Sequence, residues 1–309
     1  MVDFDFISIS EIENKLIAEA KGKYGKVYEN AESLVFLVWD FLKSAEADAW
    51  IFVSFLSQVQ KFATLSLLST LRHHNAQSFM NIRQIFEAGV LAAYSLRKGD
   101  DKAFYYKDEN DVAYVNEDVR MKAYKWLEQN YESHSNSIKN QKEIINSMWT
   151  HSSILLTSFN FELNGEQKLS TSLFDKEDDF HTKSDLWFLA NSCWGFLDLF
   201  AKEITKTKMA KLSDDFVSKM TQYGKDNEEL KKEFTADPRI RKWENIIKKN
   251  DTLIPVTNSQ GSHTEQSGGI PQEFELNANK ILKEVSEKID LVYHTSATDS
   301  LRSIADGRF

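Results

Sequence analysis

The residues best suited to chemistry follow a short turn at His73, in a segment that is otherwise strongly apolar. Arg83 and Glu87 lie four residues apart, so a helix would place them on one flank, where they can form an ion pair. A polar band follows another side of the same predicted helix and consists of His74, Gln77, Asn81 and Gln84. These side chains are expected to be partly buried, and a buried polar group without a partner costs about 1–3 kcal/mol. We therefore predict a hydrogen-bond network at this helix.

A second candidate lies further along the chain, at His151 and Ser152. Away from the His73–His74 turn, His151 is the only histidine that falls inside a predicted apolar helix. If the fold brings His151 to Arg83 and Glu87, the site holds an acid/base group, a cation and a carboxylate. That combination is sufficient for phosphodiester or nucleotide chemistry without a metal. The structural alternative is a satisfied core histidine beside an ion pair that fixes the packing of two helices.

The functional interpretation assigns two roles to these residues. The predicted catalytic residues are Arg83, Glu87 and His151. The predicted binding residues are His74, Asn81, Gln84 and Ser152. Whether these side chains meet, and whether the protein is an enzyme, depends on how the helices pack.

Several common chemistries lack their sequence motifs here. There is no phosphate-binding loop of the G-x-x-x-x-G-K-[ST] type, no dinucleotide-binding G-x-G-x-x-G after a strand, no G-x-S-x-G and no H-E-x-x-H. The single cysteine, Cys193, excludes a zinc site made of several thiolates, and no Glu-x-x-His pair of the di-iron bundles is present. We therefore predict neither a metal site nor a cofactor.

The elements that must position these residues are helices. The chain contains 3 prolines, all beyond residue 237, and 11 glycines, too few turn formers for a β-rich protein of this length. Two nearly charge-free helices are predicted over 46–72 and 75–98, joined by a tight turn, and helices this apolar are normally buried on most sides. They should lie at the centre of a bundle, or at its centre and a dimer interface. Further helices are predicted over 10–22, 27–43, 119–131, 135–160, 183–206, 212–234 and 237–250.

The predicted fold is an all-α multi-helix bundle with long central up-down helices and a C-terminal helical appendage. Two helix starts are predicted from capping boxes, at Ser10–Glu13 and at Thr182–Asp185, and Val2–Ser8 alternates as in a short strand or an extended arm. The predicted segments are an N-terminal arm and short helix (1–26), the bundle core (27–206), a charged helical extension (207–250), a flexible linker (251–275) and a C-terminal amphipathic helix (276–309).

Charge and hydropathy restrict the partners. The net charge of −9 argues against wholesale binding along a nucleic-acid backbone, which needs clustered Lys and Arg, but it allows a local basic patch. The first residues do not form a secretory signal, and the most apolar stretches are interrupted or too short to span a bilayer. We expect a cytoplasmic protein that does not insert into a membrane. Its apolar central helices favour a homodimer or another partner protein.

The segment from Phe55 to Leu96 resembles a group of bacterial proteins distantly related to the HEPN superfamily. The resemblance rests on an apolar helix, an Arg-His turn, the pattern Asn81-x-Arg83-x-x-x-Glu87-Ala88 and a later helix with His151-Ser152, and it extends over about residues 27–206. HEPN proteins are helical bundles, and many act as ribonucleases or RNA-associated toxins in phage defence and toxin–antitoxin systems. Their nucleases carry an Arg followed four to six residues later by His, and no histidine of this chain has that spacing. The resemblance therefore implies the fold and a connection with RNA, without the nuclease activity.

Three functions remain open from the sequence. The first is a HEPN-like accessory or effector protein of a bacterial stress or phage-defence system that binds or acts on RNA or nucleotides, with Arg83, Glu87 and His151 in one cavity. The second is a non-enzymatic oligomeric interaction module, with those residues satisfied internally and a large apolar interface. The third is a small-molecule-sensing bundle with a closed apolar cavity among the aromatic residues Trp149, Trp187 and Trp194.

Overall fold

The computed structural model describes residues 5–97, 101–148, 160–163, 169–175 and 178–239. The described residues up to Lys231 belong to one compact unit, and residues 232–239 to a second. The first unit therefore includes the predicted core (27–206), the helix before it and much of the charged segment after it. The predicted linker (251–275), the C-terminal helix (276–309), His151 and Ser152 lie outside the described residues.

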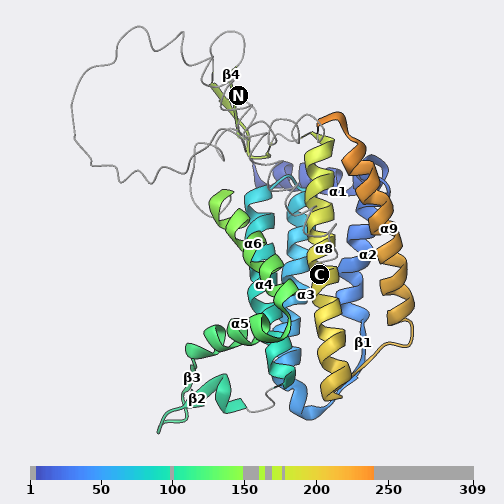
Figure 1. Ribbon diagram of the computed structural model, residues 1–309. Coiled ribbons are helices and arrows are strands. Elements are labelled where there is room, and N and C mark those ends of the chain that lie inside the picture. Colours follow the sequence, from blue (N-terminus) through green and yellow to red (C-terminus); the bar gives the residue numbers. More distant parts are fainter. Residues whose placement is uncertain (1–4, 98–100, 149–159, 164–168, 176–177, 240–309) are drawn as a thin grey trace, which may run out of the picture. The chain divides into compact units, whose positions relative to one another are not determined.

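The prediction of an all-α bundle is confirmed (Figure 1). The α-helices are α1 (Phe6–Tyr24), α2 (Lys26–Asp40), α3 (Trp50–Leu71), α4 (Asn75–Arg97), α5 (Asp118–Asn130), α6 (Glu132–Met148), α8 (Asp179–Thr207) and α9 (Phe216–Ala236). Short 3-10 helices span Ala47–Ala49 and Asp101–Ala103. The strands are β1 (Leu42–Ala45), β2 (Tyr105–Lys107), β3 (Ala113–Val115), β4 (Phe161–Leu163), β5 (Leu169–Thr171) and β6 (Ala210–Leu212).

The two nearly charge-free helices, α3 and α4, pack against each other at the centre of the unit. The predicted tight turn between them is confirmed, and His73 reverses the chain there with a left-handed φ of 58°. Next to the turn the hydroxyl of Ser78 lies 2.9 Å from Ser66 Oγ and 2.7 Å from Thr70 Oγ1. All three residues are buried. These hydroxyls satisfy one another, so the small side chains let the two helices approach closely without leaving polar groups unpaired.

Helix α8 completes the central layer by packing against α2, α3 and α4. Aromatic rings fill the space between these helices. The ring of Phe200 lies 6.0 Å from that of Phe41 and 5.6 Å from that of Phe52, centroid to centroid, and Phe196 contacts both Phe86 and Phe200. Aromatic pairs at such distances add to the free energy gained from burying their area. The aromatic-rich sequence of α8 therefore forms the inner wall of the bundle.

Two predicted helix starts are wrong. The first helix begins at Phe6, where the carboxylate of Asp5 accepts a hydrogen bond from Ser8 N (2.7 Å), so Ser10–Glu13 lies inside the helix and Phe6–Ser8 is neither strand nor arm. Helix α8 begins at Asp179, where Asp178 caps the backbone N–H groups of Phe180 and His181. In both cases an aspartate precedes the predicted cap. Its negative charge also interacts favourably with the helix N-terminus.

The short strands form two-stranded antiparallel pairs at the ends of helices. Strand β6 pairs with β1, Ala45 opposite Ala210, and Lys43 Nζ contacts Asp214 Oδ2 at 2.7 Å. This pairing ties the segment after α8 to the loop before α3. Strands β2 and β3 form an antiparallel hairpin before α5.

One described helix, Ala47–Leu71, is long and apolar enough to cross a membrane by length and composition. This is weak evidence for a membrane span, because the core helix of a soluble protein meets the same criteria. Here α3 packs against α1, α2, α4 and α8, and 39% of this apolar window is buried.

Gly89 on α4 provides a test of the central packing. A methyl group at this position would overlap the ring of Phe196 on α8, whereas a methyl group at Gly22 on α1 would meet nothing within 4 Å. We predict that Gly89→Ala lowers the free energy of unfolding by about 1–3 kcal/mol because the core is overpacked. Gly22→Ala should raise it by about 1 kcal/mol or less through helix propensity. Urea unfolding of both variants checks this, and a Gly89→Ala protein as stable as the parent would contradict the described α4–α8 contact.

Candidate functional site

The site residues predicted from the sequence do not gather at one place. Arg83 and Glu87 meet on α4, whereas His74 lies at the start of that helix, roughly 14 Å away from Arg83 along the helix axis. His151 and Ser152 lie outside the described residues. The predicted ion pair is thus present, and its meeting with His151 stays a prediction.

Glu87 is the centre of a cluster of charges, called here the Glu87 cluster. Its carboxylate lies 3.7 Å from Arg83 Nε, 3.9 Å from Arg120 Nη1 and 3.2 Å from Lys142 Nζ. Lys142 Nζ also donates a hydrogen bond to the hydroxyl of Tyr124 (3.0 Å) and lies 4.7 Å from the centre of that ring. The cluster therefore joins α4, α5 and α6.

Partial burial strengthens the ion pairs of the Glu87 cluster relative to ion pairs on an open surface. The exposed fraction of the side chain is 18% for Lys142, 22% for Glu87 and 31% for Arg83, and it rises to 65% for Arg120. Charges that are partly removed from water interact more strongly and are screened less by salt. Three cations face one carboxylate, so the cluster has an excess of two positive charges.

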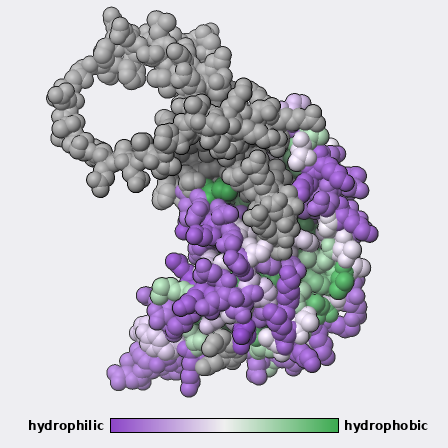
Figure 2. All heavy atoms as spheres, in the orientation of Figure 1, coloured by the Kyte–Doolittle hydropathy of each residue, from purple (hydrophilic) through white to green (hydrophobic). Residues whose placement is uncertain are grey.

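The helices that carry the cluster are fixed by apolar contacts with α4. Figure 1 shows α5 and α6 diverging from their shared turn, and each of them packs on α4. On α5 the buried side chains Ala123, Trp126 and Leu127 leave Arg120 and Tyr124, four residues apart, on an adjoining face. In Figure 2 the visible surface of α5 and α6 is mainly hydrophilic. The cluster thus lies on the polar side of the bundle.

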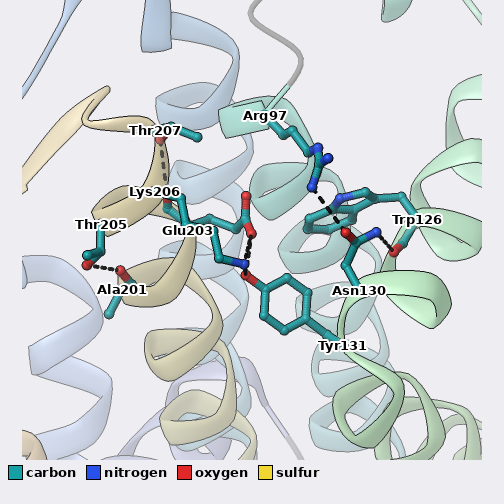
Figure 3. Close-up of polar contacts among 9 residues, drawn as sticks. All are labelled: Arg97, Trp126, Asn130, Tyr131, Ala201, Glu203, Thr205, Lys206 and Thr207. Atoms are coloured by element: carbon teal, nitrogen blue, oxygen red, sulfur yellow. Dashed lines mark hydrogen bonds and ion pairs between the residues drawn. The ribbon is translucent and has the colours of Figure 1, made fainter.

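Polar contacts with α8 hold the turn before α6 in place (Figure 3). Tyr131, at the turn between α5 and α6, donates its hydroxyl proton to the carboxylate of Glu203, and Lys206 contacts both groups. Glu203 is almost fully buried, with 1% of its side chain exposed. Because a buried carboxylate without partners is very costly, these contacts make the position of Tyr131 sensitive to the position of α8. Beside them Arg97 at the end of α4 donates a hydrogen bond to Asn130 (3.1 Å).

One turn further along α6, the buried His134 contacts Asp198 of α8, with 3.0 Å between Nε2 and Oδ2. Lys202 contacts the same oxygen at 2.5 Å. Burial raises the pKa of Asp198, but the hydrogen bonds from His134 and Lys202 outweigh that effect and hold the pKa below its ordinary value of 3.8. Asp198 is therefore a second anchor between α6 and α8.

A small cavity lies between α4, α6 and α8, and has room for about one water molecule. Its lining residues are Phe86, His134, Ile138, Gln141, Ser192, Gly195, Phe196 and Leu199. Trp187 and Trp194 are not among them, and Trp149 lies outside the described residues. This cavity does not match the aromatic ligand cavity of the third function considered above.

His74 belongs to a separate group of charges beside the α3–α4 turn. Its Nε2 lies 3.0 Å from Glu13 Oε1 on α1, Arg72 Nε lies 3.4 Å from the other oxygen, and the imidazole stacks on Phe174. The backbone N–H of Asn75 donates to Asp175 (2.7 Å). These contacts hold α1 and the segment before α8 against the turn.

The remaining predicted binding residues do not form one network with His74. Asn81 is buried, and its Nδ2 has no hydrogen-bond partner within the described part of the chain. Gln84 is half-buried on α4. The predicted polar band is therefore divided between the turn and the body of the helix.

Three residues of the Glu87 cluster were missed from the sequence: Arg120, Tyr124 and Lys142. They come from polar helices in which charged residues of both signs alternate, a pattern that normally indicates a solvated surface. The i,i+4 spacing of Arg120 and Tyr124 is a weak signal, because it shows that both share a face without showing what that face contacts.

Comparison with protein-family models, with curated proteins and with solved structures finds no match to this chain. The HEPN-like resemblance of residues 27–206 therefore stays an expectation from the sequence. Among the described residues, no group of three or more His, Cys, Asp or Glu side chains is placed to hold a metal ion.

The contacts of Asp198 predict how the free energy of unfolding depends on pH. Because its pKa is lowered on folding, Asp198 stabilises the fold above pH 3.8, and this contribution is lost as the pH falls below 3.8 through the lowered pKa. Hydrogen bonds to charged groups contribute about 1.5–3 kcal/mol each, so Asp198→Asn should lower the free energy of unfolding by about 2 kcal/mol at pH 7.

Urea unfolding of parent and variant at pH 7 and at pH values below 3.8 measures this difference, which should shrink in acid. Asp111→Asn is the matched control, because Asp111 forms an exposed ion pair with Lys107 and its loss should change stability little. A difference for Asp198→Asn that is the same at every pH would show that its carboxylate charge is not what stabilises the α6–α8 contact.

Proposed function

We propose that this protein binds RNA or nucleotides through their phosphate groups, as a HEPN-like accessory or effector protein of a bacterial stress or phage-defence system. The observation that supports the proposal is the convergence of Arg83, Arg120 and Lys142 from three helices on one carboxylate. A purely structural ion-pair network would be expected to balance its charges more closely. The surplus of two positive charges favours an anionic ligand.

The residue types fit phosphate. A guanidinium group presents N–H donors in a planar fork that matches two phosphate oxygens, and a lysine adds a compact positive charge. In the described part of the chain, the ion pairs with Glu87 are the only side-chain interactions of Arg83 and Arg120. Most of their N–H donors are therefore available to a ligand.

The site is local, because the chain as a whole carries a net charge of −9. Few phosphates can be contacted, so binding should depend on salt much less steeply than for a protein that follows a long stretch of backbone. A cytoplasmic location is part of the proposal. It agrees with the single cysteine, Cys193, which is fully buried and whose pKa burial raises to about 12.

Substitution of the cations tests the proposal. Lys142→Ala and Arg120→Ala should each weaken binding of a fluorescent single-stranded RNA about tenfold, and each should reduce the salt slope of log K by about 0.7 per lost phosphate contact. Lys122→Ala is the matched control, because Lys122 lies on the same helix and pairs with Asp118 away from the cluster. Fluorescence anisotropy over a salt series measures both quantities, with ATP as a competitor. If the parent binds neither RNA nor ATP, the proposal fails.

A second candidate is the oligomeric interaction module, and exposed aromatic residues on α2 favour it. Phe36 has 60% and Trp39 50% of its surface exposed, and aromatic residues are enriched at protein interfaces. In this alternative the protein forms a homodimer through α2. Figure 2 shows apolar surface on the side of the unit where α2 lies.

Phe36→Ser tests the dimer. If α2 forms the interface, the variant should weaken self-association about tenfold or more, because a central aromatic residue often dominates an interface. Met121→Ser on α5 is the control, since Met121 is 68% exposed on a different helix. Sedimentation velocity over a concentration series measures the effect. A parent protein that stays monomeric throughout would count against this candidate.

A further inference from the structure

We propose that the Glu87 cluster selects a terminal phosphate, a phosphomonoester, over the internal phosphodiesters of a nucleic acid. This inference rests on the proposed function, because it concerns the ligand of the same site. The shared chemistry is a phosphate group with a single ester bond, which occurs on a free nucleotide and at a phosphorylated end of RNA.

The first argument is charge. Among the described residues, Glu87 is the one carboxylate that pairs with Arg83, Arg120 and Lys142, which leaves two positive charges to be balanced. A phosphomonoester carries about −1.5 to −2 at pH 7 and balances them, whereas a diester carries a single charge. In a partly buried site, charge left unbalanced is costly.

The second argument is competition with Glu87. The carboxylate already lies among the three cations, at 3.2–3.9 Å from them. A diester that displaced it would replace one negative charge by another, with little electrostatic gain. A monoester brings a second charge and a third terminal oxygen, so it can compete with the carboxylate or share the cations with it.

The third argument is the gradient of exposure. Lys142 is the most buried cation at 18%, Arg83 follows at 31%, and Arg120 is mostly exposed at 65%. A ligand that approaches from the Arg120 side reaches Lys142 only if its phosphate can enter first. The end of a chain or a free nucleotide can do so. A phosphate within a continuous strand carries a nucleotide on each side, so it would stay at the exposed edge of the cluster, beside Arg120.

The test compares two RNA oligonucleotides of one sequence, with a 5′-phosphate or a 5′-hydroxyl group, by fluorescence anisotropy with the full chain. We expect the phosphorylated form to bind about tenfold more tightly. Glu87→Gln removes the competing charge, so it should tighten binding of both forms and keep the preference for the phosphorylated form. If Glu87 served only to hold the helices together, Glu87→Gln would weaken binding instead. Lys122→Ala should leave both affinities unchanged.

AMP and adenosine 3′,5′-cyclic monophosphate, measured by calorimetry, identify the source of the phosphate. Binding of AMP in preference to the cyclic diester supports a free nucleotide, and preference confined to the phosphorylated oligonucleotide supports an RNA end. Equal affinity for monoester and diester overturns the inference while the proposed function stands. Absence of binding to every probe overturns the proposed function itself. Arg120→Ala provides the loss-of-binding variant, because its exposed side chain can be removed with little effect on folding.

Discussion

The contact between α3 and α4 is the constraint on which the other helices depend. The two helices carry few charges, and both bury apolar side chains against each other and against the helices around them. Their close approach next to the turn relies on small hydroxyl side chains that bond to one another, with Ser78 opposite Ser66 and Thr70. Serine and threonine side chains are small enough to let the two backbones approach closely. Their hydroxyl groups can form hydrogen bonds across the interface.

Helix α4 serves both the core and the candidate site. One side of it contacts α3 and the rings of α8, and Gly89 allows Phe196 to lie directly on its backbone. Arg83 and Glu87 lie on a flank that α5 and α6 reach from outside. A charged group on so well anchored a helix has little freedom to move, which favours a preorganised binding site. Separate polar contacts hold the turn before α6, at Tyr131, and α6 itself, at His134, to α8.

Much of the fold was predictable from the sequence, because long apolar helices without proline give a clear periodic signal. The turn at His73 and the Arg83–Glu87 pair follow from local spacing. The starts of α1 and α8 were misplaced, since an aspartate a few residues earlier competes successfully with a capping box. Of the Glu87 cluster, only Arg83 and Glu87 were predictable from the sequence. Lys142 is 55 residues away from Glu87 in the chain, so only the packing of α6 on α4 brings the two together.

The pairing of β1 with β6 has a consequence for how the chain acquires its structure. Ala45 and Ala210 are separated by roughly 165 residues, and joining such distant segments closes a large loop at an entropic cost. Because β6 follows α8 in the sequence, the ladder can form only after the ribosome has released both α8 and β6. Until then α3 and α4 can form their local hairpin, but the surface that α8 covers stays open to water. During synthesis this unfinished bundle exposes apolar surface and is therefore prone to aggregation.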